Sequence, residues 1–371
     1  MKKQLRTQEN AGCAPSSVTL DRKRFLQLLD RANTQRRLAS LRKKTATIKQ
    51  IVSDETGDEK LFSDGANGNA ISLRRDVLLV ELDQVLEAQT LERARYYLRR
   101  LERGVKREKT GAVNDINLGR WKEYEEVLTD SLWNLPKRDT AGAHLGWYWG
   151  NFIPQIPRQL LLRYTKKNDW VLDAFLGSGT TLIECRRMGR NGIGIELNPE
   201  VARKARELIN RESNPYGART EIIRGDSKTI KIGKALERLG VRQVQLLVMH
   251  PPYHDIITFS ESEKDLSTAE SAGKFLKMFG EVLDNVTPAL ERGRYFALVI
   301  GDKYEKGEWV PLGFECMSEV LKRDYTLKSI IVKNFEETRA KRDQKQLWRY
   351  RALAGGFYIF KHEYIFLFKK R

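Results

Sequence analysis

Cysteine and histidine are scarce in this chain of 371 residues, which holds three cysteines and four histidines. Cys13, Cys185 and Cys316 are far apart, form no Cys-x-x-Cys pair and have no histidine beside them at metal-ligand spacing. We therefore expect neither a zinc site nor a disulfide framework, and we predict no bound metal. This cysteine pattern fits a reducing cytosol.

Long apolar runs are also missing. The first ten residues, MKKQLRTQEN, are basic but lack the apolar stretch of a signal peptide. No segment approaches the roughly 18 consecutive apolar residues that a membrane-spanning helix needs. We therefore expect no membrane partner and a location in the cytoplasm.

Acidic residues are outnumbered, with 49 Asp and Glu against 67 Lys and Arg, which gives a formal net charge of +18. An excess of this size predicts a polyanionic partner, with nucleic acid ahead of an anionic membrane surface. Solvated basic faces without any partner are the alternative. The hydrophobic content of 40% supports a buried core, and the length allows one large domain or two ordinary ones.

The first 130 residues form a basic region for which we predict mainly helical structure. Residues 1–50 contain 13 Lys and Arg against 3 Asp and Glu, and the pattern from Asp21 to Ile51 is compatible with a helix. A stronger helix is expected from Leu78 to Leu101, because apolar residues recur there at steps of three and four. Gly104 either ends this helix or weakens it.

Strand and helix signals alternate from about residue 140 to the end of the sequence, within the catalytic domain that we place at residues 131–371. This alternation indicates a mostly parallel sheet with helices on both faces. Two strand-like runs at the end predict a terminal hairpin that adds an antiparallel edge. The predicted strands are 169–175, 191–197, 220–226, 244–250, 294–302, 328–334, 356–360 and 363–369, and the predicted helices are 180–188, 199–211, 275–290 and 314–322.

A glycine-rich segment, DAFLGSGTT (173–181), lies where a predicted strand ends and a helix begins. Gly177 and Gly179 permit a tight turn and a close approach of the backbone to a ligand. Ser178, Thr180 and Thr181 can cap the helix and bond a carboxylate near its positive end. The segment lacks the Gly-Lys-Ser/Thr of an ATPase phosphate loop and the spacing of a dinucleotide fingerprint.

Two acidic residues follow at the ends of the next two predicted strands. Glu196 ends the second strand, where a carboxylate can accept both ribose hydroxyls of a nucleoside. Asp226 ends the third strand, where it can accept from an adenine amino group. Either acid alone would be an ordinary surface carboxylate. In register with the glycine loop, at the carboxyl ends of parallel strands, they suggest an adenosyl ligand.

The run VLDAFLGSGTTLIECRRMGRNGIGIEL (171–197) resembles the cofactor motif of the amino-methylating DNA methyltransferases of bacterial modification systems, with Ala174 where that family usually has proline. The resemblance covers about residues 131–371. It implies a Rossmann-like methyltransferase fold for this catalytic domain, with a mostly parallel seven-stranded sheet and an antiparallel terminal strand. It also implies S-adenosyl-L-methionine as the cofactor. The implied cofactor-binding residues here are Asp173, Phe175, Gly177, Ser178, Gly179, Thr180, Thr181, Glu196, Asn198, Asp226 and Ser227.

Two further segments resemble the same family. The segment GNFIPQIPRQLLLRYT (150–165) is similar to the part that closes over the methionine end of the cofactor, with Phe152 and Pro154 at the matching positions. An ordinary amphipathic helix would explain the same pattern. The segment 361–370 is similar to the closing strand of the family. There we expect His362 and Glu363 to be a structural pair at the start of an edge strand, not catalytic residues.

The tetrapeptide His250-Pro251-Pro252-Tyr253 directly follows the fourth predicted strand. Its two prolines fix φ and remove backbone donors, so the loop is rigid and can present a carbonyl to a substrate. Tyr253 offers an aromatic face to a flipped-out base. The family motif is Asp/Asn/Ser-Pro-Pro-Tyr/Phe, so these four residues are the implied catalytic residues, and His250 departs from the motif.

By resemblance, the carbonyl of Pro251 and the side chain of residue 250 accept the two hydrogens of the target amino group. A neutral imidazole has one acceptor nitrogen, so His250 could serve in this role. It could also take the released proton, because the ordinary pKa of histidine is near neutrality. The alternative is that His250 only packs at the end of the strand.

Two regions are candidates for target recognition: the basic residues 1–130, and the segment TRAKRDQKQLWRYR (338–351). The second has six Lys and Arg, one acid and interleaved aromatic residues. Such a pattern can hold phosphates and stack on bases, although a solvated loop is the alternative. The candidate DNA-binding residues in it are Arg339, Lys341, Arg342, Lys345, Trp348 and Arg349.

Taken together, the resemblance implies a site-specific DNA methyltransferase of a prokaryote or phage, acting on an exocyclic amino group of a flipped-out base in double-stranded DNA. Cytosine N4 is favoured over adenine N6, because an uncharged acceptor at residue 250 is closer to the serine of cytosine-N4 enzymes than to the aspartate of adenine enzymes. An RNA base amino-methyltransferase and a catalytically weak DNA-binding relative are the alternatives. A cognate restriction endonuclease, and the choice between monomer and homodimer, stay open.

Overall fold

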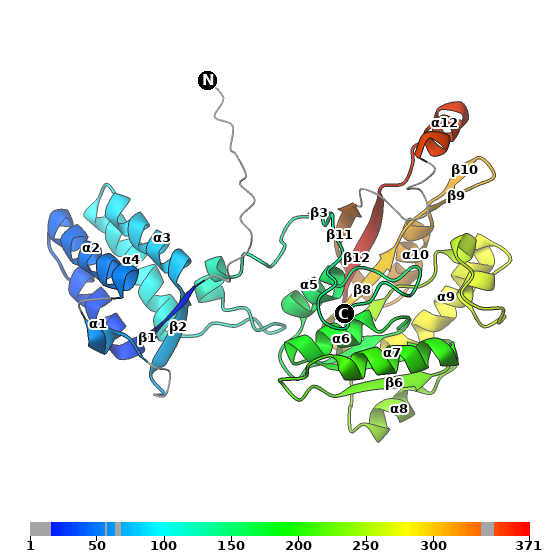
Figure 1. Ribbon diagram of the computed structural model, residues 1–371, viewed down its shortest axis with the longest axis horizontal. Coiled ribbons are helices and arrows are strands. Elements are labelled where there is room, and N and C mark those ends of the chain that lie inside the picture. The colour runs from blue at the N-terminus through cyan, green and yellow to red at the C-terminus, as the bar shows by residue number, and fades with distance from the viewer. Residues whose placement is uncertain (1–15, 56–57, 64–67, 335–344) are drawn as a thin grey trace. The chain divides into compact units, whose positions relative to one another are not determined.

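The computed structural model describes residues 16–55, 58–63, 68–334 and 345–371. The chain packs as two units, coloured blue to cyan and green to red in Figure 1. The first unit contains the chain up to residue 112 and residues 116–126, and the second contains residues 113–115 and 127–371. In the described part of the chain, no helix is long and apolar enough to cross a membrane. The assignment of recognition to residues 1–130 and of catalysis to residues 131–371 stays a prediction.

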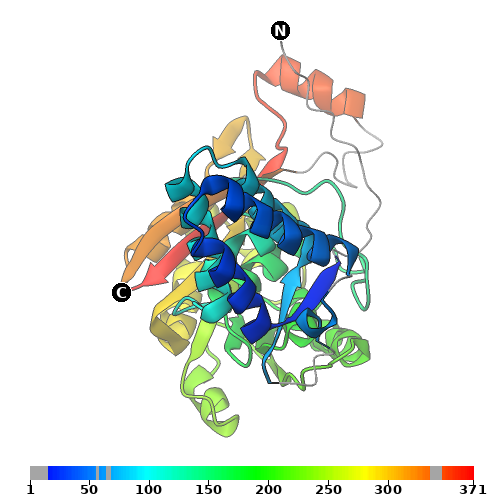
Figure 2. The same cartoon turned by 90° about the vertical axis from the view of Figure 1, so that its left-hand side faces the viewer.

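Among its described residues, the first unit contains four α-helices, two short 3-10 helices and a two-stranded antiparallel ribbon (Figures 1 and 2). Its helices share one apolar core, in which Phe25, Leu41, Leu82 and Leu98 are fully buried. The elements are β1 (Ser17–Asp21), α1 (Arg22–Asn33), α2 (Leu38–Asp54), β2 (Ala70–Arg74), α3 (Arg75–Glu87), α4 (Leu91–Lys106) and two short 3-10 helices, Glu59–Leu61 and Leu118–Glu123.

The structure corrects both long helices that the sequence predicted in this unit. The pattern from Asp21 to Ile51 forms α1 and α2, and the pattern from Leu78 to Leu101 is divided between α3 and α4. The second break has a local cause, because the side chain of Thr90 accepts from the backbone N–H of Arg93 and caps α4. Gly104 lies inside α4, where a Cβ atom would come within 2.7 Å of the Gly119 carbonyl oxygen. Gly104 therefore permits close packing and does not end the helix.

The second unit is built on an eight-stranded sheet with the strand order β3-β11-β12-β8-β7-β4-β5-β6. The predicted fold class, with a mostly parallel sheet and an antiparallel terminal strand, is confirmed, and the short strand β3 extends the expected seven strands at one edge. The strands are β3 (Leu132–Asn134), β4 (Trp170–Asp173), β5 (Asn191–Glu196), β6 (Thr220–Arg224), β7 (Val244–Met249), β8 (Leu290–Ile300), β11 (Tyr325–Asn334) and β12 (His362–Lys370).

Helices cover both faces of this sheet, because successive residues of its strands point to opposite faces and both faces are buried. The helices of the first face are α5 (Gln155–Tyr164), α6 (Thr180–Met188) and α7 (Pro199–Arg211), and those of the second are α8 (Ile232–Arg238), α9 (Ala272–Val286) and α10 (Leu312–Leu321). Val171 and Val248 point to the first face and share a core with α5, whereas Leu172 and Leu247 point to the second face and share a core with α8, α9 and α10.

The last strand differs from its expected place. β12 pairs antiparallel with β8 on one side and with β11 on the other, so it lies inside the sheet and not at an edge. The run 356–360 forms no strand; the helix α12 (Lys345–Gly355) and an irregular segment precede β12. A small ribbon of β9 (Lys303–Glu305) and β10 (Glu308–Val310) follows β8. Together these corrections bring the start of β12 next to the centre of the sheet.

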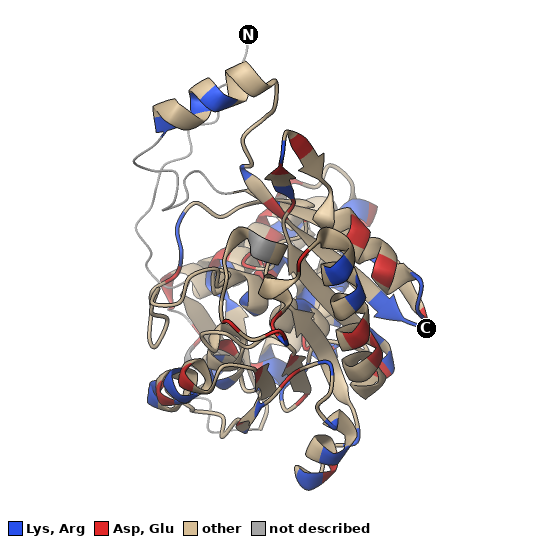
Figure 3. Cartoon of the chain, turned by 90° about the vertical axis from the view of Figure 1, so that its right-hand side faces the viewer, with Lys and Arg blue, Asp and Glu red and all other residues tan. Residues whose placement is uncertain are grey.

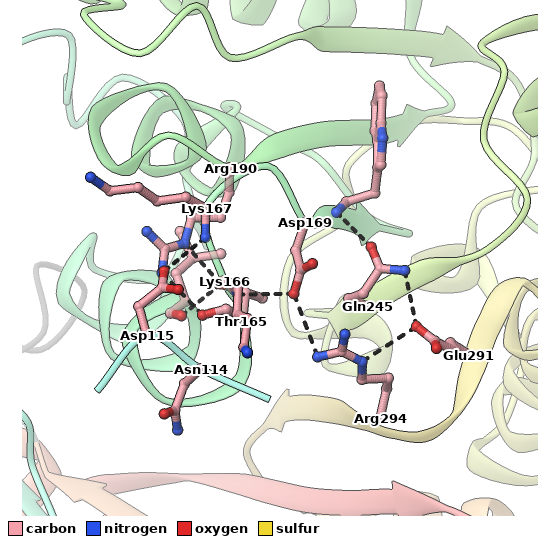
Figure 4. A network of polar contacts seen from close by, with 12 residues as sticks. Asn114, Asp115, Thr165, Lys166, Lys167, Asp169, Arg190, Gln245, Glu291 and Arg294 are labelled. Carbon is pink, nitrogen blue, oxygen red and sulfur yellow. Dashed lines mark hydrogen bonds and ion pairs between the residues drawn. The ribbon is translucent and has the colours of Figure 1, made fainter. Parts of the chain in front are cut away.

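The short segment 113–115 is held on the second unit by a polar network around Arg190 (Figure 4). The buried guanidinium of Arg190 donates to Asp115 Oδ2 at 3.0 Å, to the Thr165 hydroxyl at 3.0 Å and to the Met188 carbonyl at 2.6 Å. The backbone N–H of Lys167 also donates to Asp115 at 2.8 Å. These bonds fix the connection close to the start of β4.

Candidate functional site

A cavity of about 910 Å³ opens at the carboxyl ends of the central strands of the second unit. The chain proceeds from β4 to β5 and β6 in one direction and returns to β7 on the other side of β4. Such a switch in direction leaves a crevice where open parallel sheets bind ligands. The cavity is lined by the glycine loop after β4, the ends of β5 and β6, and the His-Pro-Pro-Tyr segment after β7.

The glycine loop has the backbone conformation that its two glycines predict. Gly177 and Gly179 have φ values of +53° and +86°, which side chains other than glycine rarely adopt. Tyr148 packs on Gly177, and a Cβ atom there would lie 3.0 Å from its ring. Gly179 is the N-cap of α6 and supplies no capping side chain, so the N-terminal end of α6 can receive a carboxylate.

Asp173 and Thr181 lie behind the loop and not on the cavity surface. The Thr181 hydroxyl donates to Asp173 at 2.5 Å, and the backbone N–H of Phe175 donates to the same carboxylate at 3.0 Å. Burial raises the pKa of Asp173 to about 6. These two predicted residues therefore hold the turn in shape, whereas Phe175, Ser178 and Thr180 line the cavity.

Glu196 ends β5 and faces the cavity. Its carboxylate accepts from the backbone N–H of Gly177 at 2.9 Å and from that of Asn198 at 2.8 Å. Burial raises the pKa of Glu196 to about 7, although both backbone bonds act in the opposite direction. A carboxylate has about four lone-pair sites, so two remain for a diol. The Glu196 carboxylate can therefore accept hydrogen bonds from both hydroxyls of a ribose.

Asp226, Ser227 and Asn198 surround the same end of the cavity. Ser227 donates to the Ala174 carbonyl at 2.6 Å, and the Asn198 side chain caps α7 by accepting from the backbone N–H of Glu200 at 2.9 Å. Asp226 accepts from the backbone N–H of Lys228 at 2.9 Å. This bond uses one of the roughly four lone-pair sites of a carboxylate, so Asp226 keeps acceptor sites for a ligand.

The segment before α5 closes another side of the cavity. Phe152 lines it, and Pro154 is the N-cap of α5. Asn151, which the sequence analysis did not single out, donates to the Ser178 hydroxyl at 2.8 Å and accepts from Arg138 at 3.1 Å. The segment is therefore tied directly to the glycine loop.

His250 and Tyr253 lie on the cavity wall with Pro251 and Pro252 between them. The His250 ring packs on Phe152, with 4.8 Å between ring centres, and its Nε2 atom is 3.1 Å from the Tyr253 hydroxyl. Burial lowers the pKa of His250 to about 4, so its imidazole is neutral at physiological pH. A neutral ring has the single acceptor nitrogen that the sequence analysis required.

Glu363 was expected to be structural, and it lies on the wall of the same cavity. The Tyr253 hydroxyl donates to Glu363 at 2.9 Å, and the ammonium of Lys333 lies 3.1 Å from the other oxygen of this carboxylate. Sequence inspection missed this position because it gave no information on the strand order. β12 lies between β8 and β11, and this places Glu363 on the cavity wall.

The loop after Tyr253 is fixed by a second buried histidine. His254 has a φ of +53°, which is rare for a residue with a side chain. Its Nε2 atom lies 2.7 Å from the Ala269 carbonyl and its Nδ1 atom lies 2.8 Å from the ammonium of Lys303. Because an ammonium can only donate, Nδ1 accepts and Nε2 donates. This pairing holds the turn that ends the tetrapeptide.

The predicted DNA-binding residues fall in two groups. Arg339, Lys341 and Arg342 lie outside the described residues. Lys345, Trp348 and Arg349 lie on α12, which has no buried residue and no acidic side chain (Figure 3). The segment after α12 is attached to the β9–β10 ribbon by two aromatic contacts, Tyr304 with Phe357 and Trp309 with Phe360, each with 4.2 Å between ring centres. Phe360 also lines the cavity.

The sheet order, with an antiparallel β12 between β8 and β11, defines the Rossmann-like fold of methyltransferases that use S-adenosyl-L-methionine. S-adenosyl-L-methionine is the cofactor of this class. The carboxyl-end cavity, Glu196 and the open N-terminus of α6 fit an adenosyl group joined to an amino acid.

Comparison with known proteins indicates which methyltransferases the chain is similar to. The model of the N6/N4 methyltransferase family, described as DNA methylase, matches residues 86–207. The Type II methyltransferase M.MjaII of Methanocaldococcus jannaschii is 42% identical over 86 residues, which are 21% of this chain and 16% of that protein. M2.LlaDCHI of Lactococcus lactis is 41% identical over 97 residues, 26% of this chain and 34% of that protein. The matched part of the chain is therefore similar to the amino-methylating DNA methyltransferases, and the resemblance seen in the sequence is confirmed.

These matches are partial. The chain covers 16% of M.MjaII, 34% of M2.LlaDCHI and 22% of M.Cfr9I of Citrobacter freundii, to which it is 41% identical over 70 residues, 19% of this chain. Among solved structures, TrmN from Thermus thermophilus superposes with a TM-score of 0.38 at 16% identity, over 60% of this chain and 50% of that one.

Proposed function

We propose that this protein is a site-specific DNA methyltransferase that modifies an exocyclic amino group of a flipped-out base, with cytosine N4 favoured over adenine N6. One observation carries the proposal: the glycine loop, Glu196 and the His-Pro-Pro-Tyr segment line a single cavity. A cofactor subsite and a base subsite in one cavity allow direct transfer between their ligands.

In this proposal, Glu196 would accept hydrogen bonds from the two ribose hydroxyls of S-adenosyl-L-methionine, and Asp226 would accept a hydrogen bond from its adenine amino group. Gly177 and Gly179 bring the backbone close to the ligand, and the N-terminus of α6 faces its carboxylate. Phe152 covers the methionine end. Asp173 and Thr181 contribute indirectly, by holding the turn.

The base subsite consists of Tyr253, on whose ring the flipped base stacks, and two acceptors for its amino hydrogens. The acceptors are the carbonyl of Pro251 and the side chain of His250. An aromatic amino group is a poor nucleophile, because its lone pair is delocalised into the ring. Two accepted hydrogen bonds favour the pyramidal form, in which the lone pair points at the methyl carbon.

When bound, S-adenosyl-L-methionine supplies the methyl group: the nitrogen–carbon bond forms as the carbon–sulfur bond breaks, and one amino hydrogen is released as a proton. The low pKa of His250, about 4, favours the acceptor role over the storage of this proton. An uncharged acceptor is also the reason for preferring cytosine N4, where relatives of the family have serine at this position.

Double-stranded DNA is the proposed partner. We assign phosphate contacts to Lys345 and Arg349 and base stacking to Trp348, together with the predicted Arg339, Lys341 and Arg342. Support comes from the absence of acidic side chains on α12 and from the attachment of the following segment to the cavity rim. The basic N-terminal region is the second candidate for recognition. The proposed location is the cytoplasm of a prokaryotic cell, and a partner nuclease and the oligomeric state stay open.

A methyl-transfer assay tests this function. The purified chain is incubated with methyl-labelled S-adenosyl-L-methionine and either duplex DNA from a methylation-free host or total RNA, and the nucleosides are identified by mass spectrometry. We expect N4-methylcytosine in DNA. N6-methyladenine would contradict the base preference, and methylation of RNA alone would contradict the DNA substrate. Cofactor binding without transfer to either would favour a catalytically weak relative.

The role of His250 is tested in the same assay. His250→Ala removes the side-chain acceptor and is expected to lower turnover by about 100-fold, whereas His250→Ser restores a neutral acceptor and part of the rate. Cofactor affinity, measured separately by calorimetry, should change little in either variant. Full turnover in His250→Ala would contradict the assigned role.

A further inference from the structure

Four side chains form one chain of polar contacts along the wall of the cavity. The Tyr253 hydroxyl lies 3.1 Å from His250 Nε2 and 2.9 Å from Glu363 Oε2. The other carboxylate oxygen of Glu363 lies 3.1 Å from the ammonium of Lys333. The four residues come from the loop after β7, from β11 and from β12, and all of them line the cavity.

The sheet fixes this arrangement. Lys333 and Glu363 face each other directly in the antiparallel pairing of β11 with β12, so the strand register sets their ion pair. Both residues are buried. Tyr253 packs on Gly301 after β8, where a Cβ atom would lie 3.0 Å from its ring. Its hydroxyl therefore has little freedom to choose other partners.

The direction of each hydrogen bond follows from counting hydrogens. The Lys333 ammonium can only donate, and the carboxylate of Glu363 can only accept. The hydroxyl of Tyr253 has one hydrogen, which points to Glu363, so toward His250 it can only accept. His250 must then carry its hydrogen on Nε2. A neutral imidazole has one N–H, which leaves the lone pair on Nδ1.

The opposite direction is unfavourable. If the Tyr253 hydroxyl donated to His250, the buried Glu363 oxygen would lose its donor. Buried carboxylate oxygens without a donor are strongly disfavoured, because nothing replaces the water they leave. The ion pair with Lys333 thus selects one of the two neutral tautomers of His250.

We propose that Glu363, held by Lys333, is a positioning residue that acts through Tyr253 to keep the acceptor lone pair of His250 on Nδ1, where the amino group of the target base can donate to it. The inference rests on the proposed function, since the amino group is the donor. Tyr253 then has two roles. Its ring face supports the base, and its hydroxyl, which donates to Glu363, accepts the hydrogen bond from His250.

Glu363→Gln is the most informative variant, because it reverses the direction of the hydrogen bonds between residue 363, Tyr253 and His250 with almost no change of side-chain shape. Lys333 still donates, so the glutamine turns its amide oxygen to Lys333 and its NH₂ group to Tyr253. Tyr253 then accepts from glutamine and donates to His250 Nε2. The histidine hydrogen moves to Nδ1, and His250 no longer offers an acceptor to the substrate.

The first measurement is nitrogen-15 NMR of the protein labelled at its four histidines, with no cofactor or DNA present. Ring nitrogens with and without a hydrogen differ widely in chemical shift, and His250→Ala identifies the relevant signals. We expect the Nε2–H form in the wild type and the Nδ1–H form in Glu363→Gln. A wild-type Nδ1–H form, or an unchanged tautomer in Glu363→Gln, would overturn the proposal.

The second measurement is steady-state methyl transfer. Glu363→Gln and Tyr253→Phe should each lower kcat by about 100-fold with little change in the KM for DNA or in cofactor affinity. Because Glu363 and Tyr253 act through the same series of hydrogen bonds, the double variant should be no slower than the slower of the two single variants. Multiplied losses would show that Glu363 acts separately from Tyr253 and would overturn the proposal.

Glu308→Gln is the matched control, since it makes the same chemical change at an exposed residue of β10. It should leave both the histidine signals and kcat unchanged. The two experiments also separate two failures. If the wild type transfers no methyl group, the proposed function fails while the tautomer measurement still stands. If transfer occurs but the tautomer does not respond, only the role of Glu363 is wrong.

Discussion

The carboxylate of Glu196 accepts a hydrogen bond from the backbone N–H of Gly177 across 2.9 Å, and this bond joins the end of β5 to the loop after β4. The two elements that form the proposed cofactor subsite are therefore linked before any ligand binds. The same carboxylate is buried, and burial raises its pKa to about 7. A ligand that donates to it must compete with a proton near neutral pH.

From this we predict that cofactor affinity depends on pH through Glu196. Ribose hydroxyls bind the ionised carboxylate, so affinity should be constant above about pH 8 and fall below pH 7 by up to about tenfold per pH unit. Calorimetric titration with S-adenosyl-L-methionine between pH 6 and 8.5, roughly the window around this pKa, measures the effect. Glu196→Gln should bind weakly and without this pH dependence, and a wild-type affinity that is flat below pH 7 would count against the assignment.

The packing of the glycine loop on β5 predicts a large effect of a single methyl group. A Cβ atom at Gly194 would lie 2.5 Å from Leu176 Cδ1, inside a buried part of the structure. Gly194→Ala should therefore lower the free energy of unfolding by about 1–3 kcal/mol and weaken cofactor binding as the loop shifts. Urea denaturation and calorimetry measure the two effects.

The control for this change is Gly273, which lies in α9 with no atom within 4 Å of the place that a Cβ atom would take. Gly273→Ala should raise the free energy of unfolding by about 0.5–1 kcal/mol, because alanine loses less backbone entropy in a helix. Equal effects of the two alanines would contradict the steric explanation.

Arg190 should be intolerant even of lysine. Its guanidinium serves four acceptor atoms at once: the Asp115 carboxylate, the Met188 carbonyl, and the hydroxyl and carbonyl of Thr165 (Figure 4). Burial lowers the pKa of Arg190. A lysine ammonium has only three donors and lacks this fork geometry, so it cannot serve all four acceptors. We expect Arg190→Lys to lower the free energy of unfolding by about 3 kcal/mol. The exposed Arg211→Lys should change it by less than about 0.5 kcal/mol, and a similar small loss in Arg190→Lys would show that the network contributes little.

The proposed DNA-binding role of α12 predicts a change in the salt dependence of DNA binding. Neutralising the exposed cations Lys345, Arg349 and Arg351 with glutamine should weaken DNA binding and reduce the slope of log K against log salt by about 0.9 for each phosphate that is no longer neutralised. The control removes the same charge from another exposed surface, by changing three cations of α8 to glutamine. These are Lys231 at its N-cap, and Lys234 and Arg238 within it. Fluorescence anisotropy over a salt series compares them, and equal slopes would argue against α12.

Local sequence was sufficient for the elements that carry the cofactor motif. The helix predicted at 199–211 is α7, and the strands around the glycine loop end within a few residues of their predicted limits. These elements have short-range signals: alternating burial, a proline at the first turn of α7, and glycines where φ is positive. Strand order has no such signal, and for this reason β12 was expected at an edge and was found inside the sheet.

The same limit explains why Glu363 was missed in the candidate site. Its partner Tyr253 is 110 residues away in sequence, and the pair meets only because β12 inserts between β8 and β11. The sequence resemblance placed Glu363 in a closing strand, but it carried no information on the strand order that brings this residue to Tyr253. His250 was recognised from its tetrapeptide, but its neutral state depends on burial, which the tetrapeptide does not encode.

The position of β12 also bears on how the protein is made. The glycine loop, Glu196 and the tetrapeptide are all synthesised long before Glu363, and the sheet has a gap beside β8 until β12 arrives. A chain still leaving the ribosome can therefore form the cofactor-binding half of the fold, since folding starts from the N-terminal side during synthesis. It gains the cavity wall formed by β12 only when β12 has left the ribosome. Until β12 has paired with β8, Tyr253 therefore lacks its hydrogen-bond partner Glu363.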